Sequence, residues 1–162
     1  MLRKIGVLVF ILCNIVLGVG AQQKEKPSGW REISVCDMTF LLPKTLKKHS
    51  RGGIDSCVAV FSDKHPSVSL DYGLYSGVGR YDNYLDFKEE SFQVDGRPGT
   101  LATYVDKLNR KNRVARIFVV LVPRSLQNLD ETSMNMFVVG SGVKTVETAR
   151  TIFGSIKFAQ EK

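Results

Sequence analysis

Cysteine and histidine are scarce in this sequence, whose 162 residues include three cysteines and two histidines. Cys36 and Cys57 are not spaced as a Cys-x-x-Cys pair, and His49 and His65 do not complete a set of four ligands with them. A structural zinc site needs four such ligands in close geometry. The sequence therefore predicts no metal site, and no motif in it indicates a cofactor.

Catalytic motifs are missing as well. No Gly-x-Ser-x-Gly nucleophile elbow occurs, so a triad drawn from Ser56, His65 and Asp63 rests only on their closeness in sequence. Asp82 and Asp86 would share one face of a helix, but no calcium-loop pattern surrounds them. We therefore predict that the protein is not an enzyme. The alternative is a small exported hydrolase that has no recognisable motif.

Long hydrophobic runs are absent except at the start of the chain. Arg3 and Lys4 precede an apolar run over residues 5–19, which is followed by small residues up to Ala21. This is the three-part pattern of a cleavable signal peptide, and the run is shorter than the roughly 20 residues of a membrane-spanning helix. We predict a signal peptide over residues 1–21, export to the periplasm or the medium, and no stable membrane insertion after cleavage. The alternative is a retained anchor.

Export changes the interpretation of the cysteines. Cleavage after Ala21 removes Cys13 and leaves the pair Cys36 and Cys57. An even number of cysteines in an exported chain favours a disulfide, because thiols are not kept reduced outside the cytosol. We expect a Cys36–Cys57 bridge, against the alternative of two buried thiols.

Basic residues outnumber acidic residues by 23 to 16, which gives the chain a formal net charge of +7. Many of the cations fall into two clusters, one in a turn-rich segment and one at a predicted hairpin tip: Lys44, Lys47, Lys48 and Arg51, then Arg110, Lys111, Arg113 and Arg116. Exposed cations attract anionic partners such as an acidic polymer or lipid headgroups. The alternative is that these charges only keep the surface solvated. Nucleic acid is not an expected partner, because the chain is exported and carries no nucleic-acid-binding motif.

Tyrosines provide a second candidate surface. Four of them flank a glycine-rich segment: Tyr72, Tyr75, Tyr81 and Tyr84. Tyrosine on such loops offers a large contact area with a polar group at its end, which suits the recognition of a partner. The alternative is that these rings pack against the edge of a sheet.

Alternating apolar residues indicate a sheet in the mature chain. We predict one domain over residues 30–160, after a flexible leader at 22–29, with about six mainly antiparallel strands and one face exposed to solvent. In this prediction residues 33–42 form one broken strand. Asp95-Gly96 lies between two apolar runs and favours a type I′ hairpin turn, and Pro98-Gly99 favours a bulge after it.

The end of the chain predicts one long helix. Apolar residues recur there at spacings of three and four: Val143, Val146, Ala149, Ile152 and Phe153. Gly154 is placed to cap the C-terminus of this helix. Packing the helix on one face of the sheet buries the apolar sides of both elements, so we predict an α+β sandwich.

Several short patterns resemble a group of exported bacterial proteins without assigned function. They are Phe40-x-x-Pro43, Cys57-Val58-Ala59-Val60-Phe61, Asp71-Tyr72-Gly73-x-Tyr75-Ser76, Val94-Asp95-Gly96-Arg97 and Ala149-x-x-Ile152-Phe153-x-Ser155-Ile156-x-Phe158. More distantly, residues 33–158 are similar to the PsbP-like αβα sandwich, named after an extrinsic protein of photosystem II. This resemblance implies a binding or assembly role and carries over no active-site residue. We therefore expect a non-catalytic binding or scaffold module of the cell envelope, whose partner is a protein or an anionic envelope component.

Overall fold

The computed structural model describes residues 26–49, 56–63, 66–74, 76, 84–122 and 132–159. Within them, ten strands form two antiparallel sheets, and one helix packs against both sheets. The expected fold of one helix on a mainly antiparallel sheet is confirmed at this level. The number of strands was wrong, because about six were expected in one sheet. Residues 1–21, the expected signal peptide, lie outside the described residues.

The larger sheet has seven strands in the spatial order β3-β4-β5-β9-β8-β7-β6. Along the chain they are β3 (Lys47–His49), β4 (Ser56–Ser62), β5 (Ser67–Gly73), β6 (Leu85–Val94), β7 (Arg97–Val105), β8 (Asn112–Val122) and β9 (Thr132–Ser141). Within this sheet, consecutive strands pair with each other, with one exception. β5 pairs with β4 and β9 but not with β6, which lies at the far edge. In the sheet, β9, β8 and β7 therefore lie between β5 and β6, although β5 and β6 are consecutive strands of the chain.

The smaller sheet contains β1 (Trp30–Val35), β2 (Met38–Pro43) and β10 (Lys157–Phe158). Residues 33–42 were expected to form one strand, but a turn at Cys36 and Asp37 divides them, and Val35 lies opposite Met38. Both turn residues have positive φ angles, 54° and 55°. Neither glycine nor asparagine, the usual residues of such a turn, marks its position in the sequence.

The Asp95-Gly96 hairpin is confirmed. Val94 lies opposite Arg97, and both turn residues have positive φ angles, 50° and 76°, as a type I′ turn requires. The bulge expected at Pro98-Gly99 is wrong, because both residues pair in register with β6. The irregularity of this pair of strands lies instead between Leu85 and Lys88.

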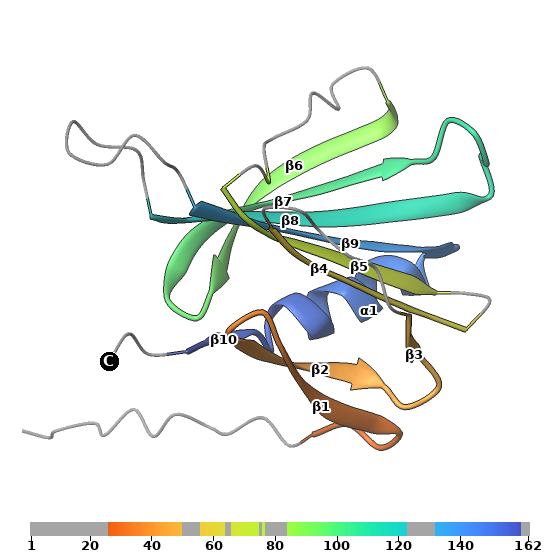
Figure 1. The fold of residues 1–162 in the computed structure, drawn as a ribbon. Helices are drawn as coiled ribbons and strands as arrows, with labels where there is room; N and C mark the ends of the chain where they lie inside the picture. Colours follow the sequence, from red (N-terminus) through yellow and green to blue (C-terminus); the bar gives the residue numbers. More distant parts are fainter. Residues whose placement is uncertain are drawn as a thin grey trace, which may run out of the picture.

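Helix α1 (Lys144–Phe153) and the small sheet cover the same face of the large sheet (Figure 1). Ala149, Ile152 and Phe153 of the expected apolar face are buried, but Val143 is exposed and precedes the helix. Gly154 follows the helix in a right-handed conformation, with φ −71° and ψ −9°, so the expected glycine cap is not of the left-handed kind. Among the described residues, no helix is long and apolar enough to cross a membrane.

The two sheets share one core and one covalent link. The ring of Phe40 on β2 meets the ring of Phe61 on β4 edge to face, with ring centroids 6.1 Å apart. The expected disulfide is present and joins Cys36, in the β1–β2 turn, to Cys57 on β4. The bridge therefore ties the small sheet to the large one.

Candidate functional site

Strand pairing brings two segments that are distant in sequence to one end of the large sheet. Lys47 on β3 lies opposite Ser62 on β4, and the same row continues across β5 and β9 to Val114 on β8. The turn before Val114 holds the second basic cluster. Both clusters therefore lie at the end of the molecule shown on the right in Figure 1. Four strand spacings separate β3 from β8, or about 19 Å.

We call this part of the molecule the basic end. It carries eight cations: Lys44, Lys47, Lys48, Lys107, Arg110, Lys111, Arg113 and Lys144. All of them are exposed except Arg113, which is half-buried. Lys107 and Lys144 were not among the predicted site residues, although Lys107 begins a run of seven residues that contains four cations. Arg51, predicted to join this group, lies outside the described residues.

Residues 106–112, which we call the tip, join β7 to β8 and are held by their own polar side chains. Asp106 Oδ1 accepts a hydrogen bond from the backbone N–H of Leu108 at 2.9 Å, and Asn109 Oδ1 accepts one from Lys111 at 3.2 Å. Asn112 donates its backbone N–H to the carbonyl of Asn109 at 2.8 Å. Side-chain acceptors of this kind stabilise a defined turn, so the tip presents its cations from an ordered loop.

The cations of the tip and the adjacent Arg113 differ in their contacts. Arg113 pairs with Asp86 at 3.4 Å, and the Lys107 ammonium lies 4.6 Å from the centre of the Tyr84 ring. Within the described ranges, neither Arg110 nor Lys111 forms an ion pair. Their charges therefore face solvent and are available to an external anion.

Arg116 does not belong to the tip, and its assignment to an exposed basic cluster is corrected by the structure. It lies in the middle of β8, where 2% of its surface is exposed. Its Nε donates a hydrogen bond to Asn135 Oδ1 at 2.7 Å, and its guanidinium lies 5.5 Å from the ring centres of Phe118 and Phe137. The contacts that compensate for burying this charge make Arg116 a structural residue.

A buried polar network continues from Arg116 to the connection that follows β5. Asn135 Nδ2 and Ser133 Oγ both donate hydrogen bonds to the carbonyl of Ser76, at 2.8 and 2.7 Å. Ser76 Oγ in turn donates to the carbonyl of Ser133 at 2.6 Å. These bonds fasten Ser76 to β9 on the face of the sheet opposite α1.

Of the four tyrosines predicted to form a recognition surface, the structure describes two, Tyr72 and Tyr84. Tyr72 packs against the edge of the hydrophobic core. Tyr84 is half-buried, and its ring stacks at a tilt on that of Tyr104, with centroids 4.7 Å apart. Both rings therefore have the packing role that was the alternative. Tyr75 and Tyr81 lie outside the described residues.

The imagined catalytic triad has no geometric basis in the described residues. Ser56 begins β4 and Asp63 follows its end, so the length of the strand separates them by about 23 Å. His65 and Asp82 lie outside the described residues. His49 instead lies 2.9 Å from Ser62 Oγ through its Nε2 atom. In the part of the chain that the structure describes, no three histidine, cysteine or acidic side chains gather to hold a metal ion.

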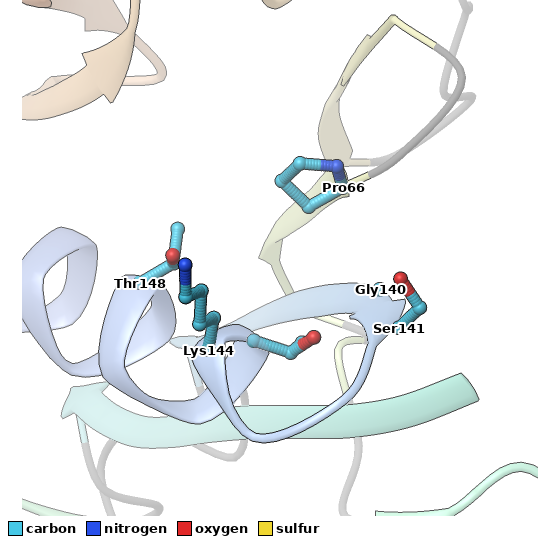
Figure 2. A pocket seen from close by; sticks show the side chains of 6 residues that line it. Pro66, Gly140, Ser141, Lys144 and Thr148 are labelled. Atoms are coloured by element: carbon cyan, nitrogen blue, oxygen red, sulfur yellow. The ribbon is translucent and has the colours of Figure 1, made fainter. Parts of the chain in front are cut away.

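A small hollow opens at the basic end beside the first turn of α1. Its volume is about 100 Å³, and it is lined by Pro66, Gly140, Ser141, Lys144, Thr145 and Thr148. Figure 2 shows Lys144 and Thr148 along the helix, with Pro66 facing them from the other side. The hollow is smaller than the 300 Å³ or more that is typical of a ligand pocket. Its hydroxyls and single ammonium add polar groups to the basic surface.

The opposite end of the molecule is different, because charges there are neutralised within the fold. Asp95 accepts hydrogen bonds from Lys157 Nζ at 2.8 Å and from the backbone N–H of Phe158 at 3.0 Å. The bond from Lys157 is the main reason why the pKa of Asp95 lies below its ordinary value, and Phe158 and the charge of Arg97 act in the same direction. In the described ranges, most of the exposed cations that form no ion pair therefore lie at the basic end.

No protein-family model matches this sequence, and no curated protein matches it.

Proposed function

We propose that this protein is an exported, non-catalytic binding module of the cell envelope, and that its basic end binds an anionic partner. The observation that carries the proposal is the excess of cations at that end. Against the eight cations stand four carboxylates: Asp63, Asp86, Asp106 and Glu147. Two of these carboxylates are already engaged, Asp86 by Arg113 and Asp106 by the backbone of the tip. The resulting positive potential attracts anions and increases their rate of association.

Two further features support the location and the type of fold in this proposal. The Cys36–Cys57 bridge is of the kind that persists in oxidising compartments, which supports export by the hydrophobic segment at the start of the chain. The resemblance of residues 33–158 to the PsbP-like αβα sandwich is the basis for proposing that sandwich as the finer description of the fold. Members of that fold serve mainly in binding and assembly, which agrees with the proposed role.

The test is retention on a dextran sulfate resin, with elution by increasing salt. We expect the variant Arg110→Gln/Lys111→Gln to elute at lower salt than the wild type. Each cation near an anionic surface contributes about 1 kcal/mol, so losing two of them weakens binding roughly 30-fold. Because both side chains are exposed, the melting temperature should not change.

The matched control is Lys88→Gln/Gln93→Glu, which lowers the net charge by the same two units at exposed positions of β6 and leaves the Lys157–Asp95 pair intact. This control should elute close to the wild type if position matters and net charge alone does not. Equal elution of both double variants would show that the tip has no special role and would contradict the proposal.

A further inference from the structure

Large apolar side chains are exposed among the cations of the basic end. Leu108, in the tip, is 98% exposed, Val143 is 71% exposed and Leu85 is 50% exposed. Only one other large apolar side chain is exposed in the described part of the chain, Leu74, at 43%. Exposed apolar residues that occur singly need no explanation, but a group of them on one surface indicates an interaction site.

The fold places these three residues at the same end. Asn112 of the tip lies opposite Ser141, the last residue of β9, so the tip and the segment before α1 are neighbours. Leu85 lies opposite Val105, directly before the tip. Figure 1 shows the β7–β8 turn and the β9–α1 junction at the same end of the sheet.

The tip combines one exposed apolar side chain with three cations in an ordered loop. Leu108 lies between Lys107 and the pair Arg110 and Lys111, and its backbone N–H is held by Asp106. That hydrogen bond engages the one carboxylate of the tip, so its negative charge is partly offset where the loop meets solvent. An exposed leucine flanked in sequence by cations matches a surface that offers both anions and hydrocarbon.

We propose that the basic end docks on the surface of an anionic lipid bilayer, with Leu108 entering the boundary between headgroups and acyl chains. This inference rests on the proposed function, because it names the anionic partner. A dissolved polyanion would neutralise the cations but would leave Leu108 in water. A bilayer surface accepts both, since apolar burial and attraction to anionic headgroups add together in interfacial binding. The cluster at Lys44, Lys47 and Lys48 lies about 19 Å from the tip at the same end of the sheet, so it adds to the positive potential that attracts the anionic headgroups.

The test uses the exported protein, with its N-terminus determined by mass spectrometry, and vesicles of phosphatidylglycerol and phosphatidylcholine. Co-sedimentation is compared for the wild type, for Leu108→Ser and for the control Leu74→Ser, which makes the same change at the opposite end. We expect Leu108→Ser to bind roughly five-fold more weakly, because part of the leucine transfer energy is lost. Leu74→Ser should bind like the wild type. All three proteins share one N-terminus, so any contribution from that segment cancels.

A second measurement reports insertion directly. In Leu108→Trp, the fluorescence emission of the new tryptophan should shift to shorter wavelength with phosphatidylglycerol vesicles. It should not shift with vesicles of phosphatidylcholine alone or with dextran sulfate. Trp30 is the only other tryptophan and contributes the same background in the wild type.

The outcomes separate the two proposals. If Leu108→Ser binds vesicles as well as the wild type does, or if neutral vesicles bind equally well, the lipid proposal is overturned. If the protein binds dextran sulfate through the tip but does not bind vesicles, the partner is a soluble polyanion and only the lipid proposal fails. If the protein binds neither dextran sulfate nor vesicles, both proposals fail.

Discussion

The Cys36–Cys57 bridge joins the two sheets, and replacing both cysteines with serine tests what that link contributes. Cys57 is exposed and Cys36 is half-buried, so serine leaves no large cavity in the folded protein. Cys36 has a positive φ angle, but serine bears the same backbone strain there, so this contribution cancels. The variant therefore mainly measures the effect of the cross-link on the unfolded chain.

The expected loss follows from the sequence separation of the two cysteines, which is 21 residues. Closing a loop of this size removes enough entropy from the unfolded chain to stabilise the folded protein by about 3 kcal/mol. For a domain of this length, that loss lowers the melting temperature by roughly 10 °C. The contact between Phe40 and Phe61 remains in the variant, so the sheets should stay packed.

Urea unfolding measures the difference in free energy. We expect reductant to lower the midpoint of the wild type and to leave Cys36→Ser/Cys57→Ser unchanged. The dependence of the unfolding free energy on urea should also become steeper without the bridge, because the unfolded chain exposes more surface. Equal midpoints of the wild type with and without reductant would refute the reasoning, as would a loss in the double variant far smaller than the expected value.

Two further predictions concern polar contacts in the fold. Asn135→Leu removes a buried partner of Arg116 and a donor to Ser76, so the free energy of unfolding should fall by about 3 kcal/mol. Chemical denaturation measures this, and a loss of less than about 1 kcal/mol would mean that Arg116 finds a replacement partner. The pKa of Asp95 in the folded protein lies below its ordinary value of 3.8, so the ionised carboxylate stabilises the fold above pH 3.8. This stabilisation is lost as the pH falls through the pKa of the folded state. Asp95→Asn should therefore melt below the wild type at neutral pH and match it in strong acid. A pH-independent difference would point to another cause.

Local signals in the sequence were sufficient for several parts of the fold. Asp95-Gly96 predicted its hairpin because few residue pairs accept two positive φ angles in succession. The spacing of Ala149, Ile152 and Phe153 predicted the buried side of α1. The even number of cysteines expected after cleavage of the predicted signal peptide predicted the disulfide. Each of these inferences depends on a few neighbouring residues or on counting alone.

Other parts depend on pairings between distant residues and could not be read from local pattern. The turn at Cys36 and Asp37 has no glycine or asparagine, so one strand was predicted where the structure has two. Arg116 was grouped with Arg113 by closeness in sequence, although three residues of extended strand carry it away from the tip and into a buried site. The meeting of the two basic clusters at one end requires the register of β3, β4, β5, β9 and β8 together.

The disulfide lies at the opposite end of the large sheet from the tip. Cys57 is the second residue of β4, whereas Ser62, which ends β4, lies in the row that leads to the basic end. The disulfide therefore links the two sheets at one end of the molecule, the basic end with its exposed apolar residues lies at the other, and the shared core lies between them. Reduction breaks the disulfide at the end opposite the basic end. Loss of this cross-link can therefore lower the melting temperature while the arrangement of cations at the basic end is preserved.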